Sequence, residues 1–286
     1  MRAIRQPGLA PSERIQWVEA RGEPITADLE PGLLLLDAVR RIFAAHGLAS
    51  GALRLGGGAF GPFAYVMPAL SETAQHAAFY SPTLRPPGLS RIRTGALTFG
   101  SRDGAPFFHC HALWTEADGA LRGGHVLPEE TFVAEPIRVS GIGLDGAAFT
   151  AEPDPETNFT LFGSVPQVGG GSGANRRVFA LRLRPNQDLS HALEAFCRER
   201  KIAGAWVHGG VGSIIGARYQ DGRRVDAFAT EMAIRSGRIA PAEDGGLEAE
   251  LEIALVDYGG AVSEGMLVRA DNPVLMTVEV VLEACG

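Results

Sequence analysis

The chain has few of the features that would place it in a membrane or outside a reducing compartment. It has 3 cysteines in 286 residues, and Cys110, Cys197 and Cys285 form neither a Cys-x-x-Cys pair nor an even framework. No run approaches the roughly 20 apolar residues that a transmembrane helix needs. The N-terminus also has no apolar core of a secretory signal. These absences predict a cytoplasmic protein with free thiols.

Positive charge is also scarce. The formal net charge is −7, the isoelectric point is about 5.5, and no basic run or Arg-Gly-Arg-Pro segment occurs. Neutralisation of phosphates supplies most non-specific affinity for nucleic acid. We therefore expect no nucleic-acid partner. The hydrophobic content of 45% and the charged content of 21% are typical of a globular protein with a sizeable core.

The most informative stretch is FFHCHALWTEADGALRGGHVLP, residues 107–128. Side chains two residues apart in a strand point to the same face. His109 and His111 are therefore expected to project together, with Cys110 pointing the opposite way into the core.

A third histidine, His125, follows after a turn. If three residues form the loop, with Gly119 in the left-handed conformation, Glu116 pairs with Ala120. His125 then lies opposite His111 on the same face. A two-residue Asp-Gly turn would shift the register by one residue and send His125 to the other face.

Three imidazoles on one face suit zinc or a related divalent ion, because catalytic zinc sites commonly use three protein ligands and leave one position open. The alternative is that these are unrelated histidines, satisfied by hydrogen bonds in a half-buried sheet. The spacing favours a metal site formed by His109, His111 and His125.

The segment HCHALWTEADGALRGGHVLP resembles the signature of the plants-and-prokaryotes-conserved (PPC) domain, as do LRLGGGAFGP and WVHGGVGSIIGAR. This resemblance implies a compact α/β fold that usually forms trimers. It also implies a fold shared with alpha-acetolactate decarboxylase, which binds its metal through three histidines. The family is often labelled DNA-binding, largely because of plant members with appended AT-hooks.

The second part of the chain resembles the first. PNQDLSHALEAFCRERKIAGAWVHGGVGS aligns with GLLLLDAVRRIFAAHGLASGALRLGGGAF, and the two hairpin segments also align. We therefore predict two duplicated α/β domains of the α+β type, each a mainly antiparallel sheet with one long helix. The predicted ranges are 1–151, a linker rich in Gly and Pro at 152–177 containing the run GGGSG, and 178–286. In the second copy Glu250, Glu252 and Met266 replace the three histidines, which indicates a degenerate site.

Other candidates are less well defined by the pattern. Glu129 and Glu130 follow the last histidine closely enough for either to act as a general base, although a surface role fits both. Arg54 lies within a predicted strand, where it should face solvent or meet a buried anion such as a substrate carboxylate. His208 stands beside the second Gly-rich loop. It is a candidate for substrate binding if it enters the three-histidine site across an interface, but the favoured alternative is a structural histidine satisfied by hydrogen bonds.

Two classes of function remain open. One is a zinc-type enzyme, a lyase or hydrolase acting on a small oxo or hydroxy acid, ester or lactone. The other is a DNA-associated or regulatory scaffold, or a small-molecule-binding protein without turnover. A homotrimer, with six domains in a ring, is the expected assembly.

Overall fold

The computed structural model describes residues 2–169 and 174–285, which we call the first half and the second half. Both consist mainly of antiparallel strands, and each contains one helix, so the chain has the expected α+β fold. The predicted GGGSG run, residues 169–173, falls mostly outside the described residues.

The first half contains long central strands and several short ones. Its central strands are β2 (Gly51–Gly56), β7 (Ser90–Arg102), β8 (Ala105–Thr115) and β9 (Leu121–Val126). The flanking strands are β1 (Ile15–Leu29), β11 (Ile137–Asp145), β12 (Ala147–Pro153) and β13 (Thr160–Pro166). The short ones are β3 (Ala59–Phe60), β4 (Tyr65–Val66), β5 (Pro68–Ala69), β6 (Phe79–Tyr80) and β10 (Val133–Glu135).

The second half has a similar arrangement with fewer short strands. Its strands are β14 (Arg176–Leu183), β15 (Ala205–Arg218), β16 (Arg224–Pro241), β17 (Leu247–Asp257), β18 (Val262–Met266) and β19 (Val274–Ala284). The β17–β18 hairpin pairs Glu252 with Met266, just as the β8–β9 hairpin pairs His111 with His125. The positions that align in the two sequences are thus cross-strand partners in both hairpins, although common descent of the halves remains a prediction.

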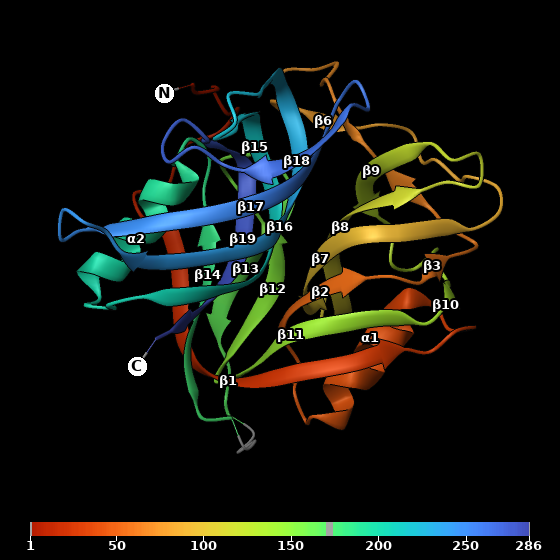
Figure 1. Cartoon of the computed structure of the whole chain (residues 1–286), viewed down its shortest axis with the longest axis horizontal. Coiled ribbons are helices and arrows are strands. Elements are labelled where there is room, and N and C mark those ends of the chain that lie inside the picture. The colour runs from red at the N-terminus through yellow and green to blue at the C-terminus, as the bar shows by residue number, and fades with distance from the viewer. Residues whose placement is uncertain (1, 170–173, 286) are drawn as a thin grey trace.

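Strand β1 joins the halves into one sheet. Its first part pairs with β14, and its second part pairs with β11. Figure 1 shows the halves on either side of the molecule, and the sheet bends so that β7 and β8 contact β15 and β16. The small apolar cluster Ala96, Val211 and Ala233 lies at this junction.

Each half has its one helix, as the sequence predicts, and the two helices lie on opposite outer sides in Figure 1. The first, α1 (Leu35–Ala45), buries Phe43, which stacks on Phe99 with ring centroids 4.4 Å apart. The second, α2 (Leu189–Glu199), has Asp188 as its N-cap, and the Asp188 side chain accepts a hydrogen bond from the backbone N–H of His191. Each has 11 residues, and within the described residues no helix is long and apolar enough to span a membrane.

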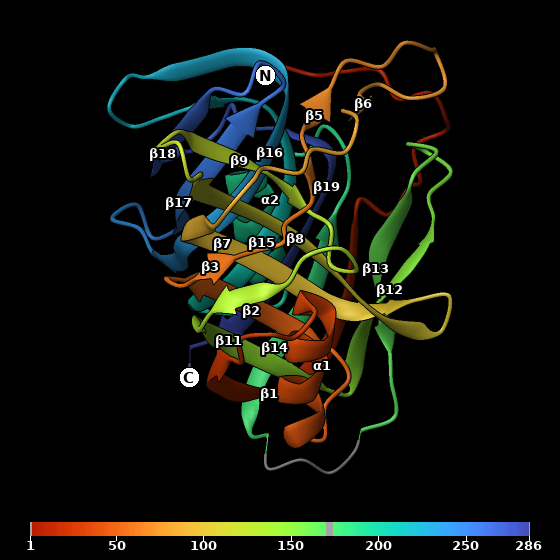
Figure 2. The ribbon, with the colours of Figure 1, turned by 90° about the vertical axis from the view of Figure 1, so that its right-hand side faces the viewer.

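The range that the sequence assigns to a linker contains ordered structure. Strand β13 pairs along its whole length with β12, and this hairpin lies beside the main sheet in Figure 2. Its turn brings Phe159 to the histidines, as described below. The domain boundaries themselves remain a prediction.

Candidate metal centre

The β8–β9 hairpin has the register that the three-residue loop requires. The backbone N–H of Glu116 donates to the carbonyl of Ala120 at 2.9 Å, and Gly119 has a φ of 84°. His111 lies directly opposite His125. Cys110 points the other way and is fully buried in the core under α1. The predicted clustering of three histidines is therefore present.

The ring nitrogens converge at separations that suit a tetrahedral ion. His109 Nε2 lies 3.1 Å from His111 Nε2, which lies 3.3 Å from His125 Nδ1. All three candidate ligand atoms lie within 4.8 Å of one another. Zinc–nitrogen bonds of about 2.0–2.1 Å at tetrahedral angles place ligand nitrogens roughly 3.3 Å apart. The separations of 3.1 Å and 3.3 Å fit that geometry.

Hydrogen bonds on the far side of two rings fix where their protons lie. His109 Nδ1 contacts Glu279 Oε2 at 2.5 Å, and His111 Nδ1 contacts the carbonyl oxygen of Met232 at 3.1 Å. A carbonyl and a carboxylate both accept, so each Nδ1 carries the proton and donates. Both Nε2 lone pairs then face each other. Either a bound cation or an additional shared proton must lie between them.

Burial opposes the additional proton. Burial, followed by the charges of His109 and His125, lowers the pKa of His111 well below its usual value. The pKa of His125 is also lowered well below its usual value, first by burial and then by the charges of His109 and Arg102. The donor set therefore fits a divalent cation of the zinc type.

The second half supplies the carboxylates that face the histidines. Glu279 on β19 is fully buried, and its Oε1 accepts a hydrogen bond from Thr277 Oγ1 at 3.2 Å. Glu231 on β16 is 5% exposed, and its Oε1 lies 3.7 Å from His111 Nε2. Glu231 Oε2 has no hydrogen-bond partner, and desolvation raises the pKa of this carboxyl well above its ordinary value.

The sequence analysis missed both carboxylates, although each leaves a signal. They lie in the apolar runs AFATEMAI and VLMTVEVVL, in which a lone acidic residue is unusual. Which histidine each one meets depends on the packing of the halves, which the local pattern does not specify.

Aromatic side chains cover the cavity beside the histidines. The ring of Tyr80 packs edge-on to His125 with centroids 5.5 Å apart, and Phe159 packs on Tyr80 at 5.7 Å. Desolvation and the charges of Glu231 and Glu279 raise the pKa of Tyr80 above its ordinary value. An adjoining cavity of about 410 Å³ is lined by His109, His125, Tyr80 and Phe159. This size suits a small molecule.

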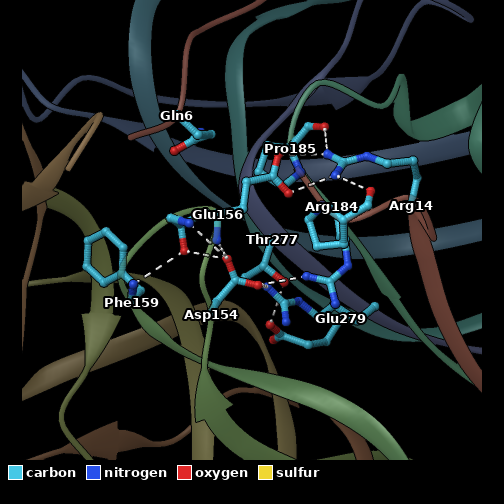
Figure 3. Close-up of polar contacts among 12 residues, drawn as sticks. Gln6, Arg14, Asp154, Glu156, Phe159, Arg184, Pro185, Thr277 and Glu279 are labelled. Carbon is cyan, nitrogen blue, oxygen red and sulfur yellow. Dashed lines mark hydrogen bonds and ion pairs between the residues drawn. The ribbon is translucent and has the colours of Figure 1, made fainter. Parts of the chain in front are cut away.

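A buried ion-pair network positions that aromatic cover (Figure 3). Asp154 Oδ1 accepts hydrogen bonds from the backbone N–H groups of Glu156 and Thr157 and thereby fixes the β12–β13 turn before Phe159. Asp154 Oδ2 accepts hydrogen bonds from Arg182 on β14 at 2.5 Å and from Arg184, the residue that follows β14, at 2.7 Å. The turn over the site is thus held by arginines of the other half.

The remaining candidates lie at the rim of the site or outside it. Glu129 and Glu130 line the 410 Å³ cavity, but both are exposed and pair with Arg102 and Arg85, respectively. Arg54 and His208 line a different cavity, so neither reaches the three histidines within this chain. The cation in the histidine cavity is Arg102, which the sequence analysis did not single out.

Comparison with known families covers the half that lacks the histidine cluster. Residues 170–286 match the family model of the Plants and Prokaryotes Conserved (PCC) domain. The three histidines precede this range. No curated protein matches the chain.

Several solved structures resemble about half of the chain. A plant- and prokaryote-conserved protein from Pyrococcus horikoshii is 17% identical, with a TM-score of 0.41, over 52% of this chain and 96% of its own. A metal-containing protein from Archaeoglobus fulgidus is 19% identical, with a TM-score of 0.41, over 51% and 96%. A candidate DNA-binding protein from Bacteroides thetaiotaomicron is 14% identical, with a TM-score of 0.36, over 51% and 96%. The resemblance to alpha-acetolactate decarboxylase remains a prediction.

Proposed function

We propose that the protein is a metal-dependent enzyme of the zinc type, a lyase or hydrolase acting on a small oxo or hydroxy acid, ester or lactone. One observation carries the proposal. Three imidazoles with converging nitrogens face the buried carboxylate of Glu231, one oxygen of which has no hydrogen-bond partner. Glu231 lines a small cavity together with His109 and His111. A purely structural histidine cluster would not require a buried acceptor without a partner.

His109 Nε2, His111 Nε2 and His125 Nδ1 would hold the ion. When bound, such an ion polarises a substrate carbonyl oxygen or lowers the pKa of water to about 7. Glu279 keeps the His109 proton on Nδ1 and so directs the Nε2 lone pair into the site.

The other side chains act on the substrate. Glu231 accepts a hydrogen bond or proton from a substrate hydroxyl, an acidic C–H group or a water in the smaller cavity that it lines with His109 and His111. Arg102 provides positive charge for a substrate carboxylate, because its pairing with Glu129 at 3.2 Å is exposed and weak. Tyr80 and Phe159 exclude water from one side.

The first test is the metal content of tag-free protein by elemental mass spectrometry, beside the His109→Ala/His111→Ala double variant and a His191→Ala control. His191 is an exposed histidine on α2. We expect close to one zinc, manganese or iron per chain in the wild type and control, and none in the double variant. Absence of metal in all three after reconstitution would overturn the proposal.

The second arm tests turnover. Metal-loaded protein is incubated with a panel of small oxo acids, esters and lactones, and products are followed by NMR. Glu231→Gln is expected to retain the metal and lose at least 100-fold in kcat, because one general acid–base group contributes typically 10²–10⁴-fold. A ligand returned unchanged would instead indicate a binding protein. Retention of duplex DNA at low salt would favour the DNA-associated scaffold.

Assembly is a separate proposal. We expect a homotrimer from the resemblance to the PPC family. Light scattering on the full chain tests this expectation, and a monodisperse monomer would contradict it.

A further inference from the structure

A second cavity lies beside the β17–β18 hairpin, at the place that corresponds in sequence to the histidine site. It is lined by Arg54, Trp206, His208, Arg238, Glu250 and Met266. Glu250 and Met266 occupy the positions that align with His109 and His125. Arg54 comes from β2 of the first half, so this cavity also contains residues of both halves.

The Arg54 guanidinium has no carboxylate partner. Its Nη2 donates to the carbonyl of Val207, while the buried Nε has no hydrogen-bond partner. Across residues 2–169 and 174–285, no ion pair to Arg54 is found. Desolvation lowers the pKa of Arg54, and no neighbouring acid offsets that effect. A half-buried, uncompensated cation is costly, and an anion from solution would offset this cost.

The other charged groups around the cavity are already paired. Arg238 forms two hydrogen bonds of 2.8 Å with the carboxylate of Glu250. Glu283 lies between His208, at 2.6 Å, and Arg176, at 2.7 Å. The positive charge of Arg54 therefore remains unneutralised. Trp206 is 53% exposed and offers an apolar surface at the same cavity.

We propose that this cavity binds a small oxyanion, the carboxylate or phosphate group of a small molecule, through the Arg54 guanidinium that lines it. A guanidinium presents its N–H groups in a planar fork that matches such oxyanions. Trp206 would contact an apolar part of the ligand, and His208 would line the opposite side. The halves thus present two different cavities, one suited to a cation and one to an anion. This site does not depend on the metal site.

The test is titration calorimetry on the full chain with two separate probes, inorganic phosphate and benzoate, at constant ionic strength with chloride as the background anion. Arg54→Met removes the charge, and Arg138→Met is the control, because Arg138 pairs with Asp28 at the surface. We expect binding by the wild type and the control, with at least tenfold weaker binding by Arg54→Met. Stronger binding of benzoate would identify a carboxylate ligand, and stronger binding of phosphate a phosphorylated one.

Two results would overturn the inference: no binding of either probe by the wild type, or equal binding by Arg54→Met. If Arg54→Met does not fold, Arg54→Lys takes its place. Lysine keeps the positive charge but lacks the planar fork of N–H groups. Binding at least threefold weaker than that of the wild type supports the site, and an affinity equal to that of the wild type refutes it. The His109→Ala/His111→Ala variant should bind both probes as the wild type does, which separates this site from the proposed metal site.

Discussion

Replacement of Glu279 by glutamine is the sharpest perturbation of the candidate metal site that leaves its three ligands in place. Glu279 Oε2 accepts the Nδ1 proton of His109 at 2.5 Å, and the side chain is completely buried. Glutamine has the same shape but no charge. Its amide can also turn its NH₂ group toward Nδ1, which would favour the tautomer with the proton on Nε2 and remove that lone pair from the metal.

The expected loss is 10- to 100-fold in metal affinity, as is typical when an outer-shell partner of a ligating histidine is removed. This corresponds to about 1.4–2.7 kcal/mol, at roughly 1.4 kcal/mol per tenfold change. The zinc affinity is measured by competition with a chromophoric chelator at fixed pH.

Glu283→Gln is the matched control, because Glu283 lies on the same strand and binds His208 rather than His109. Thermal unfolding of the metal-free proteins shows whether each variant folds. A change below twofold in Glu279→Gln, or an equal loss in Glu283→Gln, would refute the assigned role of Glu279.

Two further predictions concern stability and thiol reactivity. Asp154→Asn should destabilise the protein by about 3–5 kcal/mol in urea unfolding at pH 7, because it leaves Arg182 buried without its partner. Although desolvation opposes ionisation, Arg182 and the bonds from Thr157 hold the pKa of Asp154 below its ordinary value. The contribution of the carboxylate is therefore present above about pH 4 and lost as the pH falls through the lowered pKa, so the gap between variant and wild type should narrow in acid. Of the three thiols, the exposed Cys285 should react rapidly with a chromogenic disulfide, and all three should react after unfolding. Burial raises the pKa of the Cys110 thiol. Burial and the neighbouring Cys285 raise the pKa of Cys197 to about 11. Fast reaction of two thiols in the native protein would therefore contradict the described packing.

The hairpin and its histidines were predictable because they depend on local rules. Strand alternation fixes the common face of His109 and His111. The sequence left two loop lengths open, and the structure has the three-residue loop with a left-handed Gly119, which places His125 opposite His111. The two helices also depend on local signals, because apolar residues recur at helical spacing in both and Asp188 caps the second. Each of these features is determined by residues close together in the sequence.

The facing carboxylates and the aromatic cover were not predictable in the same way. Glu279 is 170 residues from His109 along the chain, and the contact depends on how the sheet bends between the halves. The range assigned to a linker contains the apolar segment TNFTLFG, and only the structure places Phe159 of this segment against Tyr80. Likewise, the sequence left solvent or an anion as the alternatives for Arg54. In the structure its Nη2 donates to a backbone carbonyl, and its buried Nε has no partner.

The division of the site between the halves links metal binding to their packing. The first half supplies the three imidazoles, and the second half supplies Glu279 and Glu231. An ion that binds only the packed arrangement stabilises it by about 2.7 kcal/mol at a free concentration 100 times its dissociation constant. By the same linkage, any change that loosens the contact of β8 with β16 would lower the affinity of the proposed site for its metal ion. The second half has Glu250, Glu252 and Met266 in place of the histidines, but it supplies both carboxylates. In the proposed enzyme it would therefore provide the acceptor that orients His109 and the acceptor that faces the substrate.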